Sequence, residues 1–289
     1  MPLTKRNQSE SRSSEHRKSS ETNRSGFHPF GGKLSRHFAD SQLHPEDPYL
    51  SYYDVRLTRE DVDSIRNDWL TDNAIAFWQE YLEHEKLNAF PKANIVLLRP
   101  SMSFMLMNVD EPLQLKEALP DFKKTTHVFL PVNDNTNVEL AEGGSHWSLL
   151  LVSIIDGVAF HYDSLSPSNY RCAQKVADHI GRLLGKPLKF VNLDDSPRQE
   201  NSSDCGVYVC LLMQHLLMSR LLKAHAGHKV SMSMGGKSVD AYGGRKEMVR
   251  IIDERRREGE RRRSRSHSPY PRKSRSPPRI GEENEDQAP

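Results

Sequence analysis

The 289-residue sequence contains 41 Lys and Arg residues and 39 Asp and Glu residues, a net charge of +2 at pH 7. Its three cysteines, Cys172, Cys205 and Cys210, form no C-x-x-C pair, and no apolar stretch follows Met1. These features argue against a disulfide scaffold, a zinc knuckle, a secretory signal and a membrane span. We therefore expect an intracellular, reduced protein with no membrane association.

The small net charge hides segments of different character. Residues 1–44 are rich in Ser, Arg and Glu, and residues 226–289 are rich first in Gly, Ser and Met and then in Arg-Arg-Arg blocks and Arg-Ser pairs. Both offer few core-forming side chains, so we predict disordered tails at 1–44 and 226–289. Residues 45–225 are then one domain with a single core. Residues 45–244 carry 26 acidic and 19 basic side chains, which favours a basic partner.

Helix signals dominate the first half of the predicted domain. Capping patterns and apolar residues at three- and four-residue spacing predict helices after Thr58 and after Thr71. Trp69 lies just before the second cap, so it is either a hydrophobic staple or part of a binding surface. The remaining patterns predict an extended stretch at 45–57, short helical pieces over 95–108 and one more helix at 111–119.

Strand signals dominate the second half. Three runs, 127–132, 147–155 and 158–162, are almost continuously apolar, which is typical of strands covered on both faces. Asp156-Gly157 predicts a hairpin between the last two runs. A long polar loop separates the first two, and long loops in compact domains are often functional.

An amphipathic helix and a short strand lead to the most apolar helix of the chain. Apolar spacing predicts a helix from Tyr170 to about Leu184 and a strand at 189–192. The run after Cys205 is apolar nearly all round, so we expect a buried helix capped by Ser203 or Asp204. Helices segregate from strands along the chain, which predicts an α+β fold.

Cys205 lies in the first turn of that buried helix, where the helix dipole favours a thiolate. A sulfur nucleophile needs a base, a group that orients the base, and donors for an oxyanion. The alternative interpretation is a small core residue, which is the usual role of a buried cysteine.

His146 and Asp163 are candidates for the base and its orienting group. His146 opens one strand of the predicted hairpin and Asp163 ends the other, so antiparallel pairing brings both to the same end of the sheet. Asp163 could then hold one ring nitrogen of His146 and leave the other to Cys205. His161, on the same strand face as Asp163, is an alternative base. Gln199 carries an amide that could share the oxyanion with the backbone N–H of Cys205.

Three short segments carry a more specific signal: Gly143-Gly144-Ser145-His146-Trp147-Ser148-Leu149-Leu150, then Phe160-His161-Tyr162-Asp163-Ser164, then Gln199 through Val209. In order and spacing they resemble the Ulp/SENP family of ubiquitin-like-modifier cysteine proteases, and within it the deneddylases, which are specific for the NEDD-type modifier. The resemblance covers roughly residues 50–217. It implies a papain-like α+β fold in which a central buried helix carries the nucleophile and packs on a mixed sheet.

The resemblance also implies a role for each matching residue. For catalysis it implies Cys205 as nucleophile, His146 as base, Asp163 as orienting group and Gln199 as oxyanion donor. For substrate binding it implies a tunnel walled by Trp69 and Trp147 over the terminal Gly-Gly, a contact of Asp72 with an arginine of the modifier, and a closing loop that includes Asn133, Asp134, Gly143 and Gly144. Two indole walls admit only residues without side chains. Neither a metal nor a cofactor is expected.

These implications predict a hydrolase, a thiol isopeptidase that cleaves after the Gly-Gly of a NEDD-type modifier through a cysteine acyl-enzyme, in precursors and in conjugates. Thr71 stands where the family pattern has Asn, and Ser203 stands where Tyr is usual; Ser there also occurs in SUMO proteases. One alternative is therefore a SUMO-specific protease of the same family. Another is an inactive modifier-binding module with an RNA-interacting tail.

The Arg/Ser-rich tail lies outside the resemblance. It could bind RNA or nuclear partners or act as a nuclear signal, and the location expected from it is cytoplasmic and nuclear. Phosphorylation of its serines would cancel the positive charge. The alternative is a solvated tail without a partner.

Overall fold

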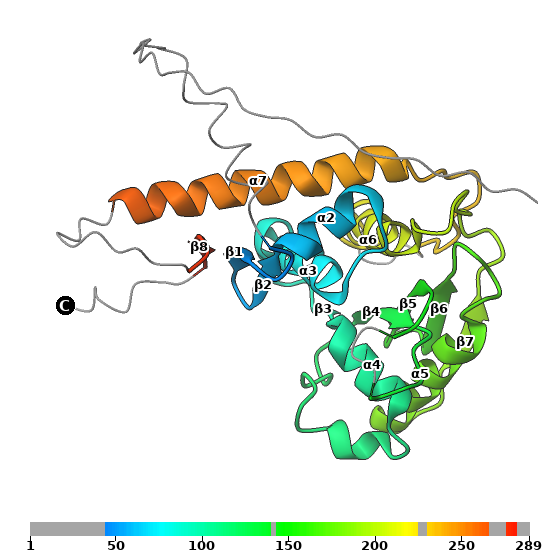
Figure 1. Cartoon of the computed structure of the whole chain (residues 1–289). Coiled ribbons are helices and arrows are strands. Elements are labelled where there is room, and N and C mark those ends of the chain that lie inside the picture. Colours follow the sequence, from blue (N-terminus) through cyan, green and yellow to red (C-terminus); the bar gives the residue numbers. More distant parts are fainter. Residues whose placement is uncertain (1–43, 140–142, 225–229, 266–275, 282–289) are drawn as a thin grey trace, which may run out of the picture. The chain divides into compact units, whose positions relative to one another are not determined.

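In the computed structural model, which describes residues 44–139, 143–224, 230–265 and 276–281, five strands form a mixed sheet in the order β3-β4-β5-β6-β7 (Figure 1). The strands are β3 (Ile95–Leu97), β4 (His127–Asn133), β5 (Trp147–Ser153), β6 (Val158–Tyr162) and β7 (Lys189–Asn192). The inner pairs, β4 with β5 and β5 with β6, are antiparallel, and the outer pairs are parallel. The sheet is therefore mixed, as an α+β fold requires.

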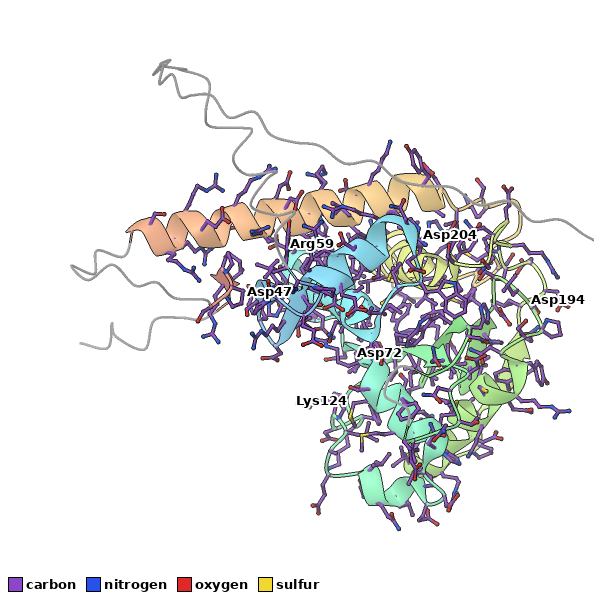
Figure 2. The ribbon with its side chains drawn as sticks, viewed as in Figure 1. Asp47, Arg59, Asp72, Lys124, Asp194 and Asp204 are labelled. Atoms are coloured by element: carbon purple, nitrogen blue, oxygen red, sulfur yellow. The ribbon has the colours of Figure 1, made fainter. Side chains whose placement is uncertain are left out.

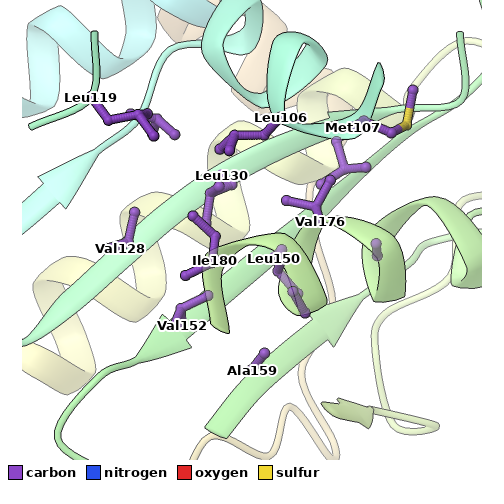
Figure 3. Packing of buried hydrophobic residues seen from close by; sticks show 14 of the residues in the cluster. Leu106, Met107, Leu119, Val128, Leu130, Leu150, Val152, Ala159, Val176 and Ile180 are labelled. Carbon is purple, nitrogen blue, oxygen red and sulfur yellow. The ribbon is translucent and has the colours of Figure 1, made fainter. Parts of the chain in front are cut away.

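Helices cover both faces of the sheet, which explains why all seven residues of β5 are buried. On one face, α4 (Pro100–Asn108) and α5 (Tyr170–Leu183) pack on alternate residues of β4 and β5, among them Leu130 and Leu150 (Figure 3). On the other face, α6 (Cys205–His215) packs on β5. The near-continuous apolar character of the strands follows from this double cover.

The predicted hairpin at Asp156-Gly157 is confirmed. Ser153 pairs with Val158 and Leu149 pairs with Tyr162, and Gly157 adopts the positive φ of 67° that the turn needs. His146 precedes the first residue of β5 and Asp163 follows the last residue of β6. The hairpin therefore carries both side chains to one end of the sheet.

The two predicted helix starts are also confirmed. Thr58 and Asp61 form a capping box at the start of α2 (Arg59–Asn67), and Thr71 accepts a hydrogen bond from the backbone of Ala74 at the start of α3 (Asp72–Glu85). A second sheet lies beside them, in the order β2-β1-β8. Its strands are β1 (Pro48–Tyr52), β2 (Val55–Thr58) and β8 (Arg279–Ile280).

One weaker helix prediction was wrong, and the prediction for 95–108 is confirmed only from residue 100 onward, where α4 forms. The stretch 111–119 contains only a 3-10 turn, η2 (Pro112–Leu115), instead of a full helix. The start of 95–108 is strand β3 rather than helix, because Ile95 and its neighbours pair with the edge of β4. Tertiary pairing overrides local propensity in this case. The other short turns are η1 (Leu87–Ala89) and the π-helix η3 (Leu216–Leu221), which extends α6.

The predicted disordered tail at 226–289 is wrong for most of its described residues. Helix α7 (Ala241–Arg265) packs against α2 and α6, and β8 pairs in parallel with β1 (Figure 1). The charged composition that suggested disorder instead supplies ion pairs one helical turn apart, such as Arg250 with Glu247 and Arg262 with Glu258. Buried Met248, Ile251 and Ile252 anchor the helix. The domain thus extends well beyond residue 225.

The predicted tail at 1–44 lies outside the described residues except for its last one. Within the described ranges, every helix is too short or too polar to cross a lipid bilayer.

Candidate active site

His146 and Asp163 meet at the end of the hairpin, with His146 Nε2 2.6 Å from Asp163 Oδ1. Both side chains are buried. The carboxylate also accepts hydrogen bonds from the backbone N–H groups of Leu165 (2.8 Å) and Asn169 (3.0 Å). Burial alone would raise the pKa of Asp163, but these hydrogen bonds outweigh it and hold the pKa below its usual value. Asp163 is therefore fixed as a carboxylate facing the imidazole.

The backbone of His146 is fixed by Asp134. The Asp134 carboxylate accepts hydrogen bonds from the backbone N–H of His146 (3.0 Å) and from the backbone N–H and hydroxyl of Ser145 (2.5 and 2.7 Å). Asp134 was predicted to bind substrate. In the structure its carboxylate is engaged in holding the segment that carries His146.

Cys205 is the first residue of α6 and is only 1% exposed. The predicted cap on this helix is wrong. Asp204 occupies the N-cap position but makes no side-chain capping bond; its carboxylate instead accepts hydrogen bonds from Arg245 and Asn201. Because no side chain caps the helix, its first N–H groups are not occupied in that way and can face a developing negative charge.

The His146 ring also interacts with Cys205. Nδ1 is buried and makes no regular hydrogen bond with the described residues. Burial would lower the pKa of His146, but the hydrogen bond from Asp163, the interaction with the Cys205 sulfur and the charges of both groups raise it to about 9. Since Asp163 occupies Nε2, Nδ1 is the ring nitrogen that remains for an interaction with the Cys205 thiol.

Gln199 is held close to this pair from two sides. Its Oε1 accepts a hydrogen bond from the Ser164 hydroxyl (2.6 Å), and its Nε2 donates to the Asn201 carbonyl (2.6 Å). An amide nitrogen carries two N–H groups, so one remains to be directed at a substrate oxygen.

The alternative base, His161, has a different environment. Its Nδ1 lies 2.8 Å from Asn192 Oδ1 on the neighbouring strand, and the structure gives it no hydrogen bond with Asp163. Burial lowers its pKa, against a smaller raising effect from Asn192 and Asp163. The structure thus pairs Asp163 with His146.

A pocket of about 540 Å³ opens beside His146. Its walls include Trp69, Asp72, Asn133, Gly143, Gly144, Ser145 and Trp147; Cys205 is not among them. Trp147 is buried, whereas Trp69 is 42% exposed, so Trp69 belongs to a surface rather than to a hydrophobic staple. Asp72 is exposed at the start of α3 (Figure 2).

A larger pocket of about 940 Å³, lined by His127 and Lys189 among others, contains none of the predicted site residues.

The two ends of the 133–146 loop, which line part of the 540 Å³ pocket, approach each other closely. A Cβ on Gly144 would lie 2.0 Å from Asn133 Oδ1, and Gly144 has a φ of 89°. A Cβ on Gly143 would lie 2.5 Å from Asn135 Nδ2. Only glycines allow this approach of the two ends of the loop. The lining of the pocket also includes four acidic residues, Glu46, Glu60, Asp61 and Asp72, which favours a basic segment in the pocket.

Sequence reasoning missed three residues that hold the site together. Ser164 bonds Gln199, Asn201 bonds Asp204, and Arg245 reaches Asp204 from α7. The polar pattern before Cys205 marked Asn201 as part of a motif. No local signal marked Arg245, because it lies 40 residues beyond the nucleophile in a segment whose composition suggested disorder.

Comparisons with known proteins agree with this geometry. The chain is 37% identical to NEDD8-specific protease 2 of Schizosaccharomyces pombe over 209 residues, 71% of this chain and 50% of the relative, so it spans about half the length of that protein. It is 35% identical to Sentrin-specific protease 8 of Mus musculus over 59% of this chain and 78% of the relative. These relatives confirm the predicted resemblance to the NEDD-specific branch.

A solved structure supports the fold. The C-terminal Ulp1 protease domain in complex with Smt3, the yeast ortholog of SUMO, matches with a TM-score of 0.54 at 18% identity, over 75% of this chain and 92% of that chain. The predicted protease fold is thereby confirmed. The model of the Ulp1 protease family, C-terminal catalytic domain, matches residues 68–226, more than half of the sequence. The chain therefore belongs to the Ulp1 protease family.

Proposed function

We propose that this protein is a cysteine protease that cleaves after the C-terminal Gly-Gly of a ubiquitin-like modifier of the NEDD8 type, in precursors and in lysine conjugates. The observation that carries the proposal is the buried His146–Asp163 pair, 2.6 Å apart, whose imidazole also interacts with Cys205. Both relatives, a NEDD8-specific protease and a sentrin-specific protease, support a ubiquitin-like modifier as the substrate, and the first of them favours the NEDD8 type.

The first step is acylation of Cys205. His146 Nδ1 takes the thiol proton, and the sulfur attacks the carbonyl carbon of the terminal glycine. Asp163 stabilises the imidazolium that forms. The carbonyl oxygen becomes an oxyanion, which the backbone N–H of Cys205 and the amide of Gln199 stabilise.

The tetrahedral intermediate then collapses. The C–N bond breaks, the imidazolium gives its proton to the leaving amine, and a thioester with Cys205 remains. In the second half of the reaction, His146 takes a proton from water and the water oxygen attacks the thioester. The C–S bond breaks, the sulfur regains its proton from the imidazolium, and the modifier leaves with a free C-terminal carboxylate.

Specificity for Gly-Gly follows from the walls of the pocket. Trp69, Trp147 and the glycine pair Gly143-Gly144 face the approach to His146, so a side chain at the terminal residues of the substrate would clash. The carboxylate of Asp72 is exposed at the same pocket and suits a cationic residue in the modifier tail. Asn133 supports this wall from within the 133–146 loop, since its Oδ1 accepts a hydrogen bond from the backbone of Asn135.

The test uses three precursors, NEDD8, SUMO and ubiquitin, each extended by a short peptide beyond Gly-Gly. We expect wild-type protein to release the peptide from NEDD8 faster than from the others, and Cys205→Ala to release none, as followed by intact mass. Cys172→Ala is the matched control and should retain activity, because this thiol lies on α5. Faster cleavage of SUMO would overturn the NEDD8 assignment. Modifier binding without any cleavage would favour an inactive binding module.

Exposed arginines near the C-terminal end of α7 suggest a second class of partner. Arg257, Arg261, Arg262 and Arg263 are exposed there. We propose that this end binds RNA phosphates and supports a nuclear as well as a cytoplasmic location. Arg261→Glu with Arg262→Glu should weaken binding to single-stranded RNA and reduce the nuclear fraction of a fluorescent fusion, without a change in protease activity. Equal RNA binding and location in this variant would refute the proposal.

A further inference from the structure

Arg245 is the fifth residue of α7 and is only 7% exposed. Its guanidinium joins two elements that are far apart in the sequence. On one side, Nη1 donates to the backbone carbonyls of Ser64 (3.1 Å) and Ile65 (2.9 Å), near the end of α2. On the other side, Nε donates to Asp204 Oδ1 (2.8 Å) and Nη2 donates to the Ser203 carbonyl (2.9 Å). Arg245 thus fixes the two residues that immediately precede Cys205.

A network of hydrogen bonds connects Asp204 to Gln199. The other carboxylate oxygen of Asp204 accepts a hydrogen bond from Asn201 Nδ2 (2.9 Å), and Asn201 Oδ1 accepts from the backbone N–H groups of Ser203 and Asp204 (both 3.0 Å). The carbonyl of Asn201 in turn accepts the Nε2 hydrogen bond of Gln199. One continuous network therefore runs from Arg245 to the amide that would meet the oxyanion.

We propose that Arg245 is a positioning residue for the thiol reaction: it holds Ser203 and Asp204 so that the sulfur of Cys205 and the amide of Gln199 address the same carbonyl group. This inference rests on the proposed function. Arg245 lies beyond residues 68–226, which the family model matches. Helix α7 is thus part of the catalytic apparatus rather than an appended tail. Figure 2 shows Asp204 below the first turns of α7.

The chemistry of this position requires arginine in particular. The planar guanidinium donates to a carboxylate and to three carbonyls at once, whereas a lysine ammonium cannot span both elements with the same geometry. The charge is buried, but Asp204 lies against it and removes the cost of an unpaired ion. A displacement of about 1 Å in reacting groups can lower the rate about 100-fold. A less firmly held 203–204 segment should therefore lower kcat.

The test compares Arg245→Lys and Asp204→Asn with wild type, using NEDD8 that carries a fluorogenic amide at its C-terminus. We expect kcat to fall about tenfold or more while KM stays within about twofold, because the pocket that binds the tail is untouched. Arg250→Lys is the matched control, since Arg250 lies on the same helix and, among the residues that the structure describes, pairs with exposed Glu247 and Glu254. It should keep the wild-type kcat.

The outcomes separate the two claims. A wild-type protein that does not turn over the probe would refute the proposed function. An active wild type with unchanged kcat in Arg245→Lys and Asp204→Asn would refute only the role of Arg245. If Arg245→Lys fails to fold, as shown by its thermal melt, Asp204→Asn decides, because it leaves the bonds from Arg245 to α2 in place. A folded Asp204→Asn with wild-type kcat would then overturn the proposal.

Discussion

His146 Nε2 lies 2.6 Å from Asp163 Oδ1, and the β5–β6 hairpin brings these two residues together from opposite strands. Burial opposes a positive charge on the imidazole, but the carboxylate and the Cys205 sulfur outweigh it and raise the His146 pKa to about 9. The protonated form of the ring is therefore favoured by the Asp163 carboxylate and by Cys205. Four predictions follow from the geometry around this pair.

Asp163→Asn should reduce kcat/KM by about 100-fold or more, because a neutral amide neither stabilises the imidazolium nor selects the ring tautomer. The backbone bonds from Leu165 and Asn169 to this side chain explain why some loss of thermal stability should accompany the change. Steady-state kinetics with the fluorogenic NEDD8 substrate checks the prediction. Asp156→Asn, at the other end of the hairpin, is the control, and equal kinetics in both variants would contradict the assigned role.

Stability should depend on the titration of His146. The pKa of His146 is about 9 in the folded protein and 6.5 in the unfolded chain, so its contribution is complete below about pH 6.5 and is lost as the pH rises through about 9. The difference in Tm between wild type and His146→Gln should therefore be larger at pH 6 than at pH 9.5. Thermal melts at both pH values measure it, and a constant difference would argue against the raised pKa.

Gly144→Ala should destabilise the loop beside His146. The added Cβ would meet Asn133 Oδ1 at 2.0 Å, and the φ of 89° is unfavourable for alanine. Gly157→Ala is a matched control, because Gly157 also has a positive φ of 67° but nothing lies within 4 Å of its Cβ. Backbone strain costs about 1–3 kcal/mol at either site. Any loss of stability and activity in Gly144→Ala beyond that in Gly157→Ala therefore measures the clash with Asn133. Equal losses would show that the close approach has no role.

Trp69→Ala should lower kcat/KM about tenfold or more with little change in Tm. The indole is 42% exposed, so its removal costs little packing, whereas an aromatic wall over the substrate tail contributes strongly to binding. Tyr242, an aromatic residue that is 71% exposed on α7, offers a control at a distance from the pocket. If Trp69→Ala keeps the kcat/KM of the wild type, the Trp69 indole does not contact the substrate.

Local patterns predicted most of the core of this fold. The Thr58 and Thr71 caps, the hairpin at Asp156-Gly157 and the buried run after Cys205 each have one strong local cause, and each element forms where that cause places it. The proximity of His146 and Asp163 followed from strand pairing alone. Their predicted roles in catalysis remain predictions.

The missed features depend on contacts that are distant in sequence. Strand β3 exists because Ile95 finds the edge of β4, and α7 is stable because Arg256 lies over the Tyr49 ring and its apolar residues reach the domain. Ser203 or Asp204 was predicted to cap α6, but the Asp204 side chain accepts a hydrogen bond from Arg245 instead. A sequence pattern reports neighbours along the chain, so it could not reveal these partners.

The most direct test of the central claim is to locate the covalent bond. Wild-type protein is incubated with NEDD8 whose C-terminus carries a vinyl sulfone, and the adduct is mapped by peptide mass spectrometry. We expect one adduct on Cys205, and a strongly slowed reaction in His146→Ala. An adduct on Cys172 or Cys210, or no adduct on the folded wild type, would contradict Cys205 as the nucleophile.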